Sequence, residues 1–205
     1  MKTVCSLIFL SLLCNTSVLA VTGMFGGYVV VNSGSSTIYG LQEYGSTDVP
    51  NYASTTLGSF TPGVDSLQIT NASGLTFKGG AGDVFGVTLN YRVFKSGDTP
   101  GSFLTQSLGF GSNAPSTDIA GNFFSGSGDQ EWKGGFAGID LLSLAGAGAG
   151  TYNVELFLKA TTNEGDRFVN NSGANYIATF AIPEPSKSLL LLLGVLGLIL
   201  RRRKI

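Results

Sequence analysis

The chain has 205 residues and a formal net charge of −1, which leaves room for one domain with appended segments rather than two full domains. Its charge is unevenly spread, because residues 21–183 hold 12 acidic and 6 basic side chains. An acidic body opposes binding to the phosphate backbone of nucleic acids, which needs a positive face. We therefore expect no nucleic-acid partner.

Residues 1–20 have the three parts of a secretory signal peptide. Lys2 supplies the basic start, residues 7–13 form a mostly apolar run, and Val18 and Ala20 place short side chains before the expected cleavage site. The apolar run is too short to span a bilayer stably. We therefore expect signal peptidase to cut after Ala20 and the body to be exported.

The two cysteines of the chain, Cys5 and Cys14, both lie in this signal peptide. The mature body then has neither cysteine nor histidine, which excludes Ser-His-Asp and Cys-His nucleophiles, histidine general bases and the usual zinc sites. Carboxylate chemistry is what remains. We expect a body without disulfides and without a cofactor, held together by its hydrophobic core.

The body, residues 21–181, contains short stretches in which apolar and polar side chains alternate, the period of a half-buried β-strand. The clearest stretches are 87–93, 152–158 and 176–182. Turn-forming residues separate them, and no stretch of helical period occurs. The pattern predicts an all-β fold, an antiparallel β-sandwich of the immunoglobulin-like or jelly-roll type. Weaker strand candidates are 28–31, 66–70, 75–78, 103–110 and 132–142.

Tyr152 stands at the entry of one predicted strand, after a segment, 145–150, in which glycine and alanine alternate. In immunoglobulin-like sandwiches a tyrosine near a strand entry can lock a corner through a hydrogen bond from its hydroxyl to nearby backbone. The alternative is a core tyrosine without that role. The glycines lack the lysine and the following helix of a phosphate-binding loop, so we predict a flexible connection.

A carboxylate pair beside an aromatic ring, formed by Asp129, Glu131 and Trp132, has the residue types of a glycosidase site. Residues two apart on a strand point to the same face about 7 Å apart, and such pairs also arise by chance. One interpretation is a ligand or catalytic site. The other is a solvated loop whose Trp132 caps the core.

Asn163, Glu164 and Asp166 offer several oxygen atoms within a short span, and Asn170 and Asn171 follow them. Calcium sites use such oxygens, but the spacing differs from that of an EF-hand loop. Asn and Asp also favour turns, because they tolerate left-handed backbone. The segment is a weak calcium candidate, with turn formation as the alternative.

The segment 182–205 forms a tail with three parts. Prolines on either side of Glu184 predict an extended joint, because proline continues neither a helix nor a strand ladder. Residues 189–200 are apolar or glycine, and in lipid a helix is the structure that pairs their backbone groups. That helix would be about 18 Å long, short of a hydrocarbon core of about 30 Å. The cations expected to stop the segment at the cytoplasmic side are Arg201, Arg202, Arg203 and Lys204.

The succession of Pro183, Glu184 and Pro185, an apolar helix and a basic cluster resembles the PEP-CTERM sorting signal of Gram-negative bacteria. The resemblance implies an exosortase, a membrane transpeptidase that cuts near these three residues. It also implies an inner-membrane intermediate and final transfer of the body to the cell surface or to the extracellular polysaccharide of a biofilm. The alternative is an ordinary C-terminal anchor.

Two functions stay open for the body. The first is a non-catalytic surface or matrix protein associated with exopolysaccharide, which agrees with the tail and with the lack of catalytic side chains other than carboxylates. The second is a secreted carbohydrate-active enzyme that uses carboxylates alone. That enzyme would need two carboxyl groups facing each other across a cleft, roughly 5–9 Å apart. We expect the first.

Overall fold

The computed structural model describes residues 21–41 and 49–184. The predicted signal peptide (1–20), the predicted membrane helix (189–200) and the basic cluster that follows it lie outside these residues. Within the described ranges, no helix has the length and apolar character needed to cross a membrane.

The described chain consists almost entirely of β-strands. The strands are β1 (Val21–Asn32), β2 (Ser36–Gly40), β3 (Thr56–Ser59), β4 (Gln68–Gly79), β5 (Val84–Lys95), β6 (Leu104–Asn113), β7 (Ser116–Thr117), β8 (Phe123–Phe124), β9 (Asp129–Asp140), β10 (Gly150–Thr162), β11 (Gly165–Val169) and β12 (Tyr176–Ile182). The helical elements are α1 (Leu141–Ala145) and the 3₁₀ turn η1 (Asn171–Gly173). The all-β prediction is confirmed.

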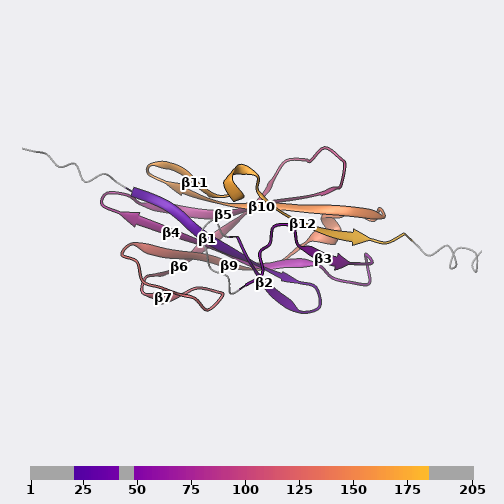
Figure 1. Cartoon of the computed structure of the whole chain (residues 1–205), viewed down its shortest axis with the longest axis horizontal. Coiled ribbons are helices and arrows are strands. Elements are labelled where there is room, and N and C mark those ends of the chain that lie inside the picture. The colour runs from indigo at the N-terminus through magenta and orange to yellow at the C-terminus, as the bar shows by residue number, and fades with distance from the viewer. Residues whose placement is uncertain (1–20, 42–48, 185–205) are drawn as a thin grey trace, which may run out of the picture.

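The strands join in one curled sheet, a half-barrel, with the order β2-β1-β4-β9-β6-β5-β10-β12-β3. Outside this order, β11 pairs with β10, and β7 and β8 form a separate two-stranded sheet. The long pairings are antiparallel, whereas β3 lies parallel to β12. β6 connects the two halves, because its residues 104–108 pair with β5 and its residues 109–113 pair with β9. The chain enters with β1 at one end of the long axis and leaves with β12 at the other (Figure 1).

The three strands predicted most clearly are present, and β12 has the predicted bounds. The separate candidates 66–70 and 75–78 are parts of one strand, β4. The predicted strand 132–142 was wrong at its end, since β9 stops at Asp140 and α1 begins. The Asp140 carboxylate caps this helix by accepting from two backbone N–H groups. Whether the curled sheet belongs to the immunoglobulin-like or the jelly-roll class stays a prediction.

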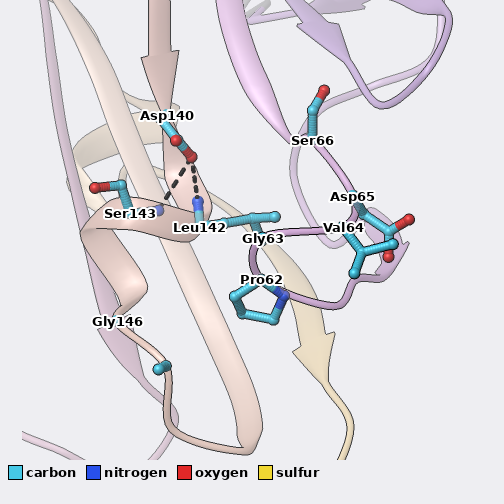
Figure 2. A pocket seen from close by; sticks show the side chains of 10 residues that line it. Pro62, Gly63, Val64, Asp65, Ser66, Asp140, Leu142, Ser143 and Gly146 are labelled. Carbon is cyan, nitrogen blue, oxygen red and sulfur yellow. Dashed lines mark hydrogen bonds between the residues drawn. The ribbon is translucent and has the colours of Figure 1, made fainter.

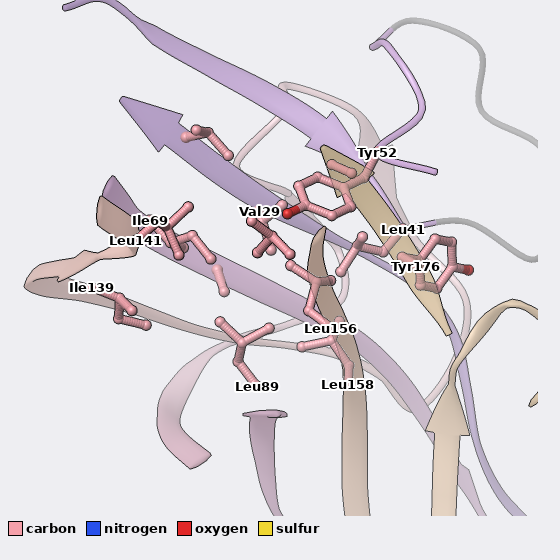
Figure 3. Close-up of a cluster of buried hydrophobic side chains, with 14 of the residues drawn as sticks. Val29, Leu41, Tyr52, Ile69, Leu89, Ile139, Leu141, Leu156, Leu158 and Tyr176 are labelled. Atoms are coloured by element: carbon pink, nitrogen blue, oxygen red, sulfur yellow. The ribbon is translucent and has the colours of Figure 1, made fainter. Parts of the chain in front are cut away.

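The core lies between the two halves of the sheet, where β1 and β4 face β5 and β10 (Figure 3). Side chains at alternate positions of β10 are buried here, among them Val154, Leu156 and Leu158. Burial of each is worth about 1.5–3 kcal/mol. Two glycines let the halves come close: a Cβ on Gly27 would overlap Leu158, and one on Gly74 would lie 2.8 Å from a Val87 methyl group.

Tyr152 lies in the core and also makes the hydrogen bond of the corner-locking prediction. Its ring is buried and stacks on Phe180, with centroids 5.4 Å apart. Its hydroxyl donates to the Gly148 carbonyl at 2.6 Å, which fixes the connection between α1 and β10. The corner-locking prediction is therefore confirmed.

Candidate functional site

Glu131 is fully buried inside the body. Its Oε1 accepts from the Ser73 hydroxyl at 2.9 Å and from the Ile119 backbone N–H at 3.0 Å. Its Oε2 accepts from the Lys133 ammonium at 2.7 Å. A carboxylate placed this way ties Ile119 to β4 and β9, and its side chain has no surface exposed to a ligand.

The other two members of the predicted group lie apart from any shared cleft with Glu131. Asp129 is half-buried at the start of β9, beside the turn at Gly126. The Trp132 ring packs against the core and meets the edge of Phe110, with centroids 5.5 Å apart. This geometry supports the part of the alternative in which Trp132 caps the core. The solvated loop was wrong, because all three residues lie in β9 and Glu131 is fully buried.

The weak calcium candidates bond to protein groups. Asn163 accepts from the Asp83 backbone N–H at 2.9 Å, and Glu164 accepts from both the backbone and the hydroxyl of Thr22 at 2.7 Å. Asp166 pairs with Lys159 at 3.2 Å. These bonds tie the β10–β11 turn to β1 and to the β4–β5 turn, which supports the turn interpretation. In ranges 21–41 and 49–184, no three His, Cys, Asp or Glu side chains form a group that could hold a metal.

The joint that begins the predicted sorting tail follows β12 without an intervening linker. Pro183 and Glu184 are exposed, while Pro185 lies outside the described residues. β12 is held on one side by β10, where Ile182 pairs with Gly150, and on the other by the segment after β3, where the Phe60 N–H donates to Ala181 at 2.9 Å. The joint therefore leaves a firmly paired strand, close to the α1–β10 connection.

Two cavities flank α1. The first, which we call the loop cavity, has a volume of about 490 Å³ and lies between the loop 62–66 and α1 (Figure 2). The second, which we call the Tyr91 cavity, has a volume of about 420 Å³. Asp140 and Ser143 line both cavities, so the two meet at α1. The remaining lining of the Tyr91 cavity consists of Tyr91, Gln106, Phe136, Ala137, Gly138, Ile139 and Leu144.

The Tyr91 cavity exists because β6 leaves β9. The first half of β9 pairs with β6, but the residues after Lys133 have no β6 partner, since residues 104–108 pair with β5 instead. Side chains of β9, β5 and β6 border this gap, and α1 closes one end of it. The cavity thus follows from the curl of the sheet.

Polar groups with unused hydrogen-bonding capacity line the Tyr91 cavity. The Oδ1 atom of Asp140 accepts hydrogen bonds from the N–H groups of Leu142 and Ser143, both at 3.0 Å (Figure 2). Within the described residues, its Oδ2, the Ser143 hydroxyl, the Gln106 carbonyl oxygen and the Tyr91 hydroxyl have no hydrogen-bond partner. Burial raises the pKa of the Tyr91 hydroxyl, so this group stays a donor in neutral and mildly alkaline solution.

No motif in the sequence marked this cavity. Tyr91 was predicted to face the core from its place in the alternation of 87–93, and the structure places it there, half-buried. Gln106, Phe136 and Ser143 come from three other elements. A search of protein-family models finds no match to the chain, and a search of curated proteins finds no significant match.

Proposed function

We propose that this chain is an exported cell-surface or extracellular-matrix protein, sorted by an exosortase and associated with exopolysaccharide through a non-catalytic body. In this proposal, signal peptidase removes residues 1–20 and the tail 182–205 holds an inner-membrane intermediate. Exosortase then cuts near Pro183, Glu184 and Pro185, and the body reaches the cell surface or the extracellular matrix.

The observation that carries the proposal is the exposed position of Pro183 and Glu184 directly after β12. A membrane-embedded transpeptidase needs an extended, accessible substrate segment, and proline keeps this one from joining a ladder or a helix. β12 is paired on both sides, so cutting after it would leave the body intact. The short apolar segment that follows makes a poor permanent anchor.

The buried position of Glu131 supports a body without catalytic activity. The alternative function, a carbohydrate-active enzyme based on carboxylates, requires two carboxyl groups exposed to one cleft. Glu131 instead bonds to Ser73, Ile119 and Lys133. We further infer a sandwich-type body, because the β1–β4 half of the sheet packs face to face on the β5–β10 half.

Fractionation of expressing cells tests the sorting step. Replacing Pro183, Glu184 and Pro185 by alanine should leave export intact but retain the uncut chain in the inner membrane. Replacing residues 201–204 by serine should instead weaken retention, because the cations resist crossing the membrane by about 2.5–3.5 kcal/mol each. A control with Asp98→Ala, in the β5–β6 turn, should behave as wild type. Equal surface delivery of wild type and the alanine variant would refute the proposal.

A further inference from the structure

The Tyr91 cavity combines two kinds of surface that one class of ligand matches. The rings of Tyr91 and Phe136 supply apolar walls. The Tyr91 hydroxyl, the Gln106 carbonyl oxygen and the Ser143 hydroxyl supply hydrogen-bonding groups. A pyranose ring presents C–H groups on its faces and hydroxyl groups around its edge. Ligand cavities of roughly 300–1,000 Å³ that hold a few convergent polar groups are typical of small-molecule sites, and this cavity measures about 420 Å³.

The charge of the cavity selects among carbohydrates. Among the described residues that line it, Asp140 is the one charged side chain, and its Oδ2 is free to accept. A carboxylate accepts hydrogen bonds from sugar hydroxyls strongly but repels a uronate or sulfate group, since no cation in the lining offsets it. The chemistry therefore fits a neutral sugar and opposes an anionic one.

We propose that the Tyr91 cavity binds one pyranose unit of a neutral polysaccharide. The sugar ring lies against the rings of Tyr91 and Phe136, and one of its hydroxyl groups donates a hydrogen bond to Asp140 Oδ2. The proposal rests on the proposed function for the source of the glycan, while the site itself rests on the cavity.

A polymer fits this end of the body better than a single sugar. The loop cavity adjoins the Tyr91 cavity at Asp140 and Ser143, so a chain that fills one cavity has room to continue across α1. The loop cavity lies on the side of the joint at Pro183, because the loop 62–66 follows Phe60, whose N–H donates to the Ala181 carbonyl. A body attached through this joint would hold the polymer close to its point of attachment.

Isothermal titration calorimetry of the full chain, in a detergent without a sugar headgroup, tests the proposal. The probes are tetrasaccharides of β-1,4-glucose, β-1,4-mannose, β-1,4-xylose and α-1,6-glucose, with tetraguluronate as the anionic counterpart. At least one neutral probe should bind, more tightly than its monosaccharide and than tetraguluronate. Gln106→Ala and Tyr91→Phe, which remove one polar group each, should weaken binding about fivefold to tenfold. Phe123→Ala, which changes an exposed side chain of β8, is the control and should bind as wild type.

Three results would overturn the proposal: no neutral probe binds, tetraguluronate binds best, or Gln106→Ala and Tyr91→Phe both bind as wild type. Circular dichroism of each variant confirms that it is folded, and both side chains are only partly buried, so neither change removes a core side chain. The two proposals fail separately. A chain that binds glycan but keeps its tail at the surface refutes the sorting step alone, and a chain that is cut but binds no neutral probe refutes the cavity assignment alone.

Discussion

Arg92 and Glu155 face each other on the outer surface of the sheet, on the paired strands β5 and β10, and form an ion pair with atoms 2.7 Å apart. The Arg92 guanidinium also lies 4.1 Å from the centroid of the Phe103 ring and donates to the Gly101 carbonyl at 2.9 Å. Glu155 accepts from the Asn175 amide at 2.6 Å. One ion pair thus fastens the β5–β6 connection and the segment before β12 to the sheet.

Glu155→Gln should lower the free energy of unfolding by about 2–3 kcal/mol. The Glu155 side chain is only 7% exposed, so its loss leaves the Arg92 guanidinium without its anion in a poorly solvated place. Asp166→Asn is the matched control, because the Lys159–Asp166 pair is 33% and 42% exposed and such surface pairs contribute about 1 kcal/mol or less. Urea unfolding of both variants measures the difference, and equal losses would contradict the account.

Glu131→Gln should destabilise the body by about 2 kcal/mol, because the Ser73 hydroxyl and the Ile119 N–H then bond to a neutral amide in place of a buried carboxylate. The segment 114–128 should become more sensitive to limited proteolysis, since its Ile119 N–H loses a charged acceptor. Asp129→Asn, two residues earlier on the same strand, should change stability by less than about 1 kcal/mol. If Glu131→Gln unfolded at the wild-type temperature, the hydrogen bonds of the Glu131 carboxylate would make no contribution to stability.

Alkaline pH should destabilise the body through Tyr52. This ring is fully buried, and its hydroxyl has no partner among the described residues. Burial raises the pKa of Tyr52 above its ordinary value, and the nearby Tyr39 adds to the shift. Above about pH 10 the unfolded chain therefore releases a proton that the folded chain keeps, and stability falls as the pH rises, by about 1.4 kcal/mol per unit.

Tyr52→Phe should remove this loss and move the alkaline unfolding midpoint to higher pH, with little change at neutral pH because no hydrogen bond is broken. Unfolding followed by fluorescence between pH 8 and 12 measures it. An unchanged midpoint would show that another group governs alkaline unfolding.

Gly27→Ala should cost about 1–3 kcal/mol, since the added methyl group would overlap Leu158 where β1 packs on β10. Gly86→Ala, in β5, is the control, because a Cβ there meets nothing within 4 Å and its effect should be small or stabilising. Thermal unfolding of the two variants compares them. The same loss at both positions would mean that general strand propensity, rather than close packing, sets the cost.

Alternation in the sequence was enough to find three of the strands that pack on the core, β5, β10 and β12. The stretch 176–182 has the observed bounds of β12, and 87–93 lies within β5. β2, β3 and β11 escaped prediction because they are short and border the sheet, so fewer of their side chains need burial. The helix α1 escaped because five residues are too few to show a helical period.

Site residues were harder to predict, because their surroundings depend on pairings between distant parts of the chain. Glu131 was recognised as a carboxylate of interest, yet its burial depends on Ser73 and on Ile119, both brought in by the fold. The Arg92–Glu155 pair depends on the register of β5 against β10. The Tyr91 cavity depends on where β6 leaves β9, and the alternation of residues along one strand does not predict which strand it pairs with.

The C-terminal residue of the protein recovered from the cell surface tests the central claim most directly. Mass spectrometry of that material should show a chain that begins after Ala20 and ends at or near Pro183, Glu184 and Pro185, with the apolar segment 189–200 removed. A surface-exposed chain that still ended at Ile205 would contradict sorting by cleavage and would leave a plain membrane anchor in its place.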